Sequence, residues 1–118
     1  MSSSRAALGT RAEDLVARHL ERQGFAIVAR NVRVGRLELD VVARKGKLVV
    51  VCEVRARMRD DFMSPIESID PRKVARVRRA TAQWLAIAGL GVVDIRFDAA
   101  SVVFDTPDGR LDYYEEAF

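Results

Sequence analysis

The stretch Leu37–Arg57 reads LELDVVARKGKLVVVCEVRAR and contains two strand patterns joined by a turn signal. Its first part alternates apolar with polar residues. Leu48–Arg55 is a nearly continuous β-branched run, which is typical of a central strand buried on both faces. The RKGK sequence between the two parts predicts a tight turn, so the whole stretch predicts a β-hairpin.

Carboxylates are depleted in strands, yet this hairpin contains three of them. We expect a two-residue turn at Lys45 and Gly46, which pairs Asp40 with Val51. Because facing residues share a side of the sheet, this register places four charged side chains on one face: Glu38, Asp40, Glu53 and Arg55. Asp40 and Glu53 are then diagonal neighbours. A slip of one residue would send them to opposite faces.

The rest of the chain limits what such a face could bind. With one cysteine, Cys52, and one histidine, His19, the sequence lacks the ligand set of a structural zinc site. A metal would therefore be bound by oxygen ligands. Mg²⁺ and Mn²⁺ prefer carboxylate, carbonyl and water oxygens, so the hairpin acids predict a site for one of these ions.

Helical patterns lie on both sides of the hairpin. Thr10 and Glu13 form a capping-box pattern that predicts a helix starting there and ending at Gly24. Asp70 and Pro71 are an N-cap and first-turn pair, and they predict a second helix that ends near Gly89. The remaining segments predict an extended strand at 25–34, a loop at 58–69, a strand region at 92–104, and a short final segment at 110–118 after a TPDG turn.

Length and composition predict one compact unit. A chain of 118 residues with 49% hydrophobic residues can build a single core, so we expect one domain, 1–118, with residues 1–8 disordered. The longest apolar run is far shorter than the roughly 20 residues that a membrane span needs. The sequence predicts a soluble, cytoplasmic protein without a membrane partner.

Positive charge is clustered in the sequence. The net charge is +3, and basic residues gather at 55–59 and at 72–79. Clustered lysine and arginine indicate a polyanionic partner such as nucleic acid, although a solvated helix face is the commoner reason for any single run.

Taken together, these motifs resemble a known family. Glu13 in the first helix, Glu38-x-Asp40 in one strand, Glu53 in the next, Lys73 opening a helix, and Arg96-Phe97-Asp98 follow the order of the YraN-type family of small bacterial proteins. The resemblance extends from about Gly9 to Phe118. It implies an α/β fold of the restriction-endonuclease-like, Holliday-junction-resolvase-like type, with a central mixed sheet flanked by helices.

The resemblance also implies a nuclease-like site of the PD-(D/E)xK type. Asp40 and Glu53 would be metal-binding carboxylates for Mg²⁺ or Mn²⁺, and Glu13 an accessory acid. Arg57, Lys73 and Arg76 would contact the backbone of the DNA substrate, which we expect to be branched or flapped. Junction-cleaving relatives act as symmetric dimers, so a homodimer is expected by analogy.

This chain departs from the motif at one position. Arg55 stands where the motif has lysine, and arginine effectively cannot lose its proton. Arg55 could still orient water or contact the scissile phosphate in a metal-dependent endonuclease. Alternatively, the protein is a nucleic-acid-binding module with impaired catalysis, or a domain that binds only proteins.

Individual residues also have alternatives. Glu13 could serve only the capping box with Thr10. Glu53 could form an ion pair with Arg55 or Arg57 in place of a metal site, because an unpaired carboxylate in an apolar strand is costly. Glu38 is expected to be a solvent-side or charge-pairing residue.

Overall fold

The computed structural model describes residues 5–58 and 70–118. Helix α1 (Arg5–Arg22) is followed by strands β1 (Ala26–Val34), β2 (Leu37–Lys45) and β3 (Leu48–Arg57). Helix α2 (Pro71–Ala88) then leads to strands β4 (Asp94–Val103) and β5 (Arg110–Tyr114). The predicted loop at 58–69 lies outside the described residues, except for Met58.

The strands form one five-stranded mixed sheet in the order β1-β2-β3-β4-β5. Neighbours pair antiparallel except β3 and β4, which are parallel. A parallel pair needs a crossover connection, and α2 lies in that connection. The predicted α/β architecture, a mixed sheet flanked by helices as in the restriction-endonuclease-like fold, is confirmed.

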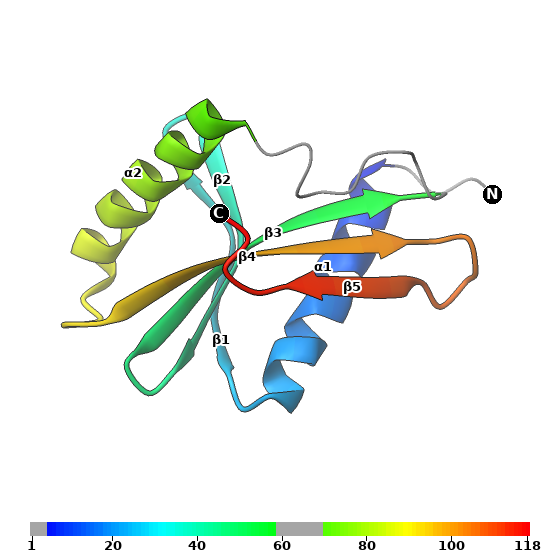
Figure 1. Ribbon diagram of the computed structural model, residues 1–118, viewed down its shortest axis with the longest axis horizontal. Helices are drawn as coiled ribbons and strands as arrows, with labels where there is room; N and C mark the ends of the chain where they lie inside the picture. The colour runs from blue at the N-terminus through cyan, green and yellow to red at the C-terminus, as the bar shows by residue number, and fades with distance from the viewer. Residues whose placement is uncertain (1–4, 59–69) are drawn as a thin grey trace.

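The two helices cover opposite faces of the sheet (Figure 1). On one face, Ala12, Val16 and Leu20 of α1 pack against Val41, Val50 and other strand residues. On the other face, Val77 and Ala80 of α2 pack against a second set that includes Val42, Val49 and Val51. The nearly continuous apolar run of β3 follows from this arrangement, because successive side chains enter two different cores.

The start of α1 differs from the prediction. Thr10 lies well inside a helix that already includes Arg5, so the capping box predicted at Thr10 and Glu13 is wrong. The helix also includes residues 5–8, which the sequence led us to expect to be disordered. Leu8 is buried in the core under α1, and this burial stabilises the additional turns despite Gly9.

The start of α2 matches the prediction. Asp70 is the N-cap, and its Oδ1 accepts a hydrogen bond from the Arg72 N–H at 2.8 Å. Pro71 is the first helical residue, and Gly89 ends the helix in the left-handed conformation. Neither described helix is long and apolar enough to cross a membrane.

The turn between β2 and β3 is one residue later than predicted. Lys45 pairs with Leu48, so the turn consists of Gly46 and Lys47. Gly46 has a φ of 60° at the first turn position, where tight hairpins require a positive φ. The register therefore shifts by two residues, and Val51 faces Val42 instead of Asp40. A shift of two preserves which side chains share a face in the paired part, where Val41–Lys45 faces Leu48–Cys52.

Candidate metal centre

The pairing of β2 with β3 stops at the predicted site. The paired part extends only to Val41 and Cys52, although both strands continue beyond it. Asp40 is the first β2 residue past this point. Its Oδ2 accepts a hydrogen bond from the Val54 backbone N–H at 2.8 Å, so a carboxylate oxygen satisfies a donor of the separated strand.

The course of β2 also changes at Asp40. Leu39 and Val42 belong to the same core under α2, whereas strict alternation would place residues three apart on opposite faces. Val41, between them, packs in the core under α1. Asp40 thus lies where β2 leaves regular alternation, beside the point where the two strands separate.

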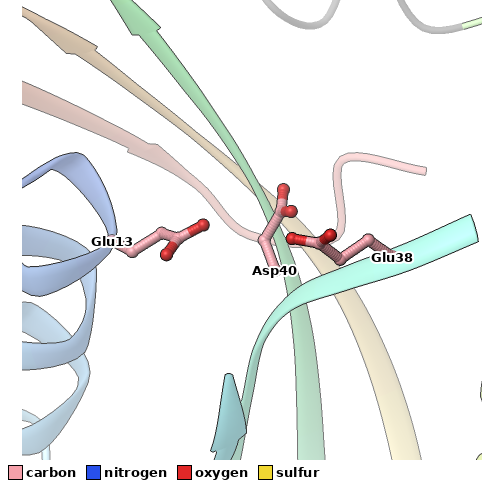
Figure 2. Close-up of side chains that lie close together, drawn as sticks. All are labelled: Glu13, Glu38 and Asp40. Atoms are coloured by element: carbon pink, nitrogen blue, oxygen red, sulfur yellow. The ribbon is translucent and has the colours of Figure 1, made fainter. Parts of the chain in front are cut away.

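Three carboxylates converge there. Among the described residues, Glu13 of α1 and Glu38 and Asp40 of β2 each offer an oxygen, and these atoms lie within 4.8 Å of one another (Figure 2). Glu13 is buried, Asp40 is half-buried and Glu38 is exposed, so the cluster extends from the interior to the surface. Carboxylates this close repel one another unless a proton or a cation lies between them. An all-oxygen set fits Mg²⁺ or Mn²⁺.

Two β1 residues hold Glu13 toward the cluster. Asn31 donates from Nδ2 to Glu13 Oε1 at 3.0 Å, and Arg30 lies 3.5 Å from the same oxygen. Arg30 also pairs with Asp14 at 2.8 Å. Because Glu13 makes these contacts from inside α1, capping does not explain it.

The environment of Asp40 disfavours its charge. Burial is the main reason that the pKa of this carboxyl rises to about 7, and the negative charges of Glu53, Glu13 and Glu38 raise it further. The hydrogen bond from Val54 opposes the rise. At neutral pH the site therefore favours a proton or a cation on Asp40.

Glu53 contacts cations from two elements. Its carboxylate pairs with Lys73 from the first turn of α2 and lies 3.7 Å from Arg55. The ion pair with Arg55 that the sequence left as an alternative is thus present. Glu53 is not part of the three-carboxylate group, yet among the neighbouring charges it raises the pKa of Asp40 most. It therefore belongs to the same electrostatic site.

Two other predicted residues, Arg57 and Arg76, belong to the elements that carry Glu53 and Lys73. Arg57 ends β3, and its carbonyl accepts a hydrogen bond from the Phe104 N–H. Arg76 lies on α2, three residues after Lys73. Glu38 has the expected ion pair, with Arg33 at 4.0 Å, but it also joins the carboxylate group.

Sequence reasoning missed two residues of the site and underestimated Glu38. Arg30 and Asn31 belong to a strand whose pattern gives no indication of a contact with Glu13. The tolerance of asparagine for positive φ is the one relevant sequence property, since Asn31 has a φ of 53°.

Comparisons with known proteins assign the chain to a family. The model of the uncharacterised protein family UPF0102 matches residues 12–102. A UPF0102 protein of Sorangium cellulosum is 54% identical over 112 residues, covering 92% of this chain and 77% of the relative. A UPF0102 protein of Acidothermus cellulolyticus is 40% identical over 128 residues, covering 99% and 97%. One of Bacteroides thetaiotaomicron is 35% identical over 111 residues, covering 94% and 91%. The chain therefore belongs to the uncharacterised protein family UPF0102, to which the YraN-type proteins belong.

Proposed function

We propose that the protein is a metal-dependent nuclease that hydrolyses phosphodiester bonds in DNA. One observation carries the proposal: the carboxylates of Glu13, Glu38 and Asp40 converge where β2 and β3 separate. Carboxylates this close repel one another, and burial raises the pKa of the central carboxyl to about 7. A divalent cation relieves this repulsion.

The donor set assigns roles to individual residues. In this proposal Asp40 holds Mg²⁺ or Mn²⁺ together with Glu53, and Glu13 and Glu38 supply further oxygens. A bound divalent cation would neutralise charge on the phosphoryl oxygens and make a bound water more acidic. Asn31 and Arg30 are positioning residues, because they hold Glu13 toward Asp40.

Lys73 offers the amine that the motif position lacks. It reaches Glu53 from α2, whereas Arg55 occupies the lysine position of the motif on β3. A lysine amine is a compact donor with three N–H groups, whereas a guanidinium is a wider planar fork. We assign Lys73 to orienting the attacking water, and Arg55 to contacting the phosphate.

A second candidate is a nucleic-acid-binding module without catalysis. The contacts of Glu53 favour it, since Lys73 and Arg55 already neutralise this carboxylate without a metal. In this case Mn²⁺ would not stabilise the protein, because only a ligand that binds the native state raises Tm.

The test is a cleavage assay on single-stranded, duplex, flapped and four-way DNA with Mg²⁺ or Mn²⁺. We expect Asp40→Asn to reduce cleavage at least about 100-fold, in line with the loss of a group that acts in the transition state. Asp112→Asn removes an exposed carboxylate on β5 and is the matched control. Wild-type cleavage by Asp40→Asn would refute the assigned role.

Two further variants separate the candidates. Lys73→Gln should abolish cleavage if Lys73 acts on the water, and Lys73→Arg should not restore it. An inactive wild type together with an active Arg55→Lys variant would favour the binding module. Mn²⁺ should raise Tm in the wild type and not in Asp40→Asn. Sedimentation of the DNA-bound protein would test the expected homodimer.

A further inference from the structure

A basic hollow lies between α2 and the turn that joins β1 to β2. Its volume is about 220 Å³, and seven residues line it: Val34, Arg36, Leu37, Arg76, Arg79, Ala80 and Gln83. Arg36 belongs to the turn, and Arg76, Arg79 and Gln83 belong to α2. Among the residues that the structure describes, the wall thus carries three guanidinium groups from two separate elements and no acidic side chain.

These arginines differ from others in the same protein. Arg30, Arg33 and Arg96 each pair with a carboxylate. Within the described part of the chain, no carboxylate lies within 4.0 Å of the guanidinium nitrogens of Arg36, Arg76 or Arg79. Arg76 donates from Nε to the Arg72 carbonyl at 3.3 Å, and with respect to the described residues its terminal nitrogens remain available. Three cations around one hollow repel one another, and an anion between them would be stabilised.

The hollow lies beside the same helix that contacts Glu53. Lys73, Arg76 and Arg79 recur every three residues, so each is a neighbour of the next on α2, from the Glu53 contact to the hollow. On the strand side, Leu37 lines the hollow, and Glu38 of the carboxylate group is the next residue but faces the other side of β2. A nucleic-acid strand that follows α2 could therefore contact both the hollow and the Lys73–Glu53 pair.

We propose that the hollow binds a backbone phosphate of the nucleic-acid strand whose neighbouring phosphodiester lies at the carboxylate site. Arginine suits this role because its planar fork matches phosphate oxygens. Val34, Leu37 and Ala80 provide the apolar part of the wall, against which the sugar packs. The inference rests on the proposed function and extends it, by assigning Arg36 and Arg79 to strand binding.

The test measures binding apart from cleavage. Fluorescence anisotropy of a labelled single-stranded oligonucleotide is recorded over a range of salt concentrations, with the Asp40→Asn protein as the parent. Adding Arg36→Gln and Arg79→Gln should weaken binding about 10- to 100-fold and reduce the salt slope by about 1 to 2, since each lost phosphate contact lowers that slope by about 0.7 on single strands.

Two controls distinguish the loss of a specific binding site from a general loss of positive charge. Adding Arg18→Gln and Arg22→Gln removes the same charge from exposed positions on α1 and should change affinity less than about threefold. Arg36→Lys with Arg79→Lys keeps the charge and should restore most of the salt slope. Equal affinity and slope in the Arg36/Arg79 and Arg18/Arg22 variants would overturn the proposal.

The result is independent of the cleavage assay. If the Arg36/Arg79 variant binds weakly while the wild type cleaves no DNA, strand binding stands and the nuclease proposal fails. If the wild type cleaves and the Arg36/Arg79 variant matches the Arg18/Arg22 control, the nuclease proposal stands and the strand-binding site is wrong.

Discussion

At the scale of single residues, Asp40 combines a structural and a chemical role. Its carboxylate accepts a hydrogen bond from the Val54 N–H where the strand ladder stops, and it is also the centre of the acidic group. Burial makes the charged form unfavourable and raises its pKa to about 7. The burial of a charged carboxylate among other acids therefore destabilises the fold, and it also favours the binding of a cation.

This raised pKa predicts a pH dependence of stability. The folded protein keeps the Asp40 proton up to a pKa of about 7, whereas the unfolded chain loses it near the ordinary value of 3.8. The folded state therefore binds more protons between these values, and the free energy of unfolding falls as the pH rises from about 4 to about 7. Each pKa unit corresponds to about 1.4 kcal/mol, so the free energy of unfolding should fall by at most about 4 kcal/mol over this pH range.

Urea denaturation with a chelator present, between pH 4.5 and 8, measures this dependence. In Asp40→Asn the fall should be smaller, because an amide oxygen keeps the acceptor for Val54 without a titrating charge. The prediction would be contradicted if the free energy of unfolding of Asp40→Asn changed with pH in parallel with that of the wild type.

Asn31 is the second residue with a specific prediction. Its backbone has a φ of 53°, and its side chain donates to Glu13. Asn31→Ala loses the hydrogen bond and must also adopt a left-handed conformation, so it should be destabilised by about 1 to 2 kcal/mol. Asn31→Gly removes the amide but tolerates the backbone, and it should be destabilised less. Thermal denaturation ranks the two variants.

The nuclease assay distinguishes strain in the Asn31 backbone from the positioning of Glu13 by the Asn31 side chain. Both Asn31 variants lose the group that holds Glu13, so both should lose cleavage to a similar extent despite unequal stability. Full cleavage by Asn31→Gly would show that Asn31 serves only the backbone.

At the scale of elements, the site depends on how α2 begins. Asp70 caps the helix, and Lys73 follows in its first turn to contact Glu53. Asp70→Ala should cost about 1 kcal/mol of folding stability, because the Arg72 N–H loses its acceptor. Asp70→Asn retains a capping oxygen and should cost less.

Chemical denaturation of both Asp70 variants measures these costs. If the first turn of α2 frays in Asp70→Ala, Lys73 also moves. The folded variant should then cleave DNA more slowly than the folded wild type. Equal stability of Asp70→Ala and the wild type would show that the cap contributes nothing in this protein.

At the scale of the whole molecule, a buried acid joins the C-terminal segment to the sheet. Asp98 of β4 is fully buried and accepts from Arg96 at 2.9 Å, from the Tyr113 hydroxyl, and from the Glu116 N–H at 3.0 Å. Burial is the main cause that raises the pKa of Tyr113 well above its ordinary value, so its hydroxyl remains a donor. The Arg96-Phe97-Asp98 motif therefore has a structural explanation.

Removing this acid should destabilise the fold strongly. Asp98→Ala removes the buried acceptor that the Arg96 guanidinium, the Tyr113 hydroxyl and the Glu116 N–H share, at a cost of about 3 to 5 kcal/mol. Asp112→Ala removes an exposed acid from β5 next to Tyr113 and should change stability by less than about 0.5 kcal/mol. Urea denaturation compares them. A cost below about 1 kcal/mol for Asp98→Ala would contradict this role.

The sequence predicted features that depend on adjacent residues more accurately than features that depend on contacts between residues far apart in the chain. Asp70, Pro71 and Gly89 located α2 correctly, since capping depends on adjacent residues. The predicted start of α1 was wrong because the burial of Leu8 outweighed the capping signal at Thr10. The hairpin register was off by two residues because Gly46, with its positive φ, suits either position of a two-residue turn, and only the pairing of Lys45 with Leu48 places it first.

By itself, the sequence determined the α/β class, the hairpin, and the placement of its charged residues on the strands, since these depend on periodicity and local turn chemistry. It also marked Asp40, Glu53 and Glu13 as candidates. The tertiary structure alone decided that Glu13 and Glu38 meet Asp40 and that Lys73 reaches Glu53. It also brought Arg36 to the arginines of α2. These contacts join residues distant in the chain, and their positions depend on where β2 and β3 separate and on how α2 packs across the sheet.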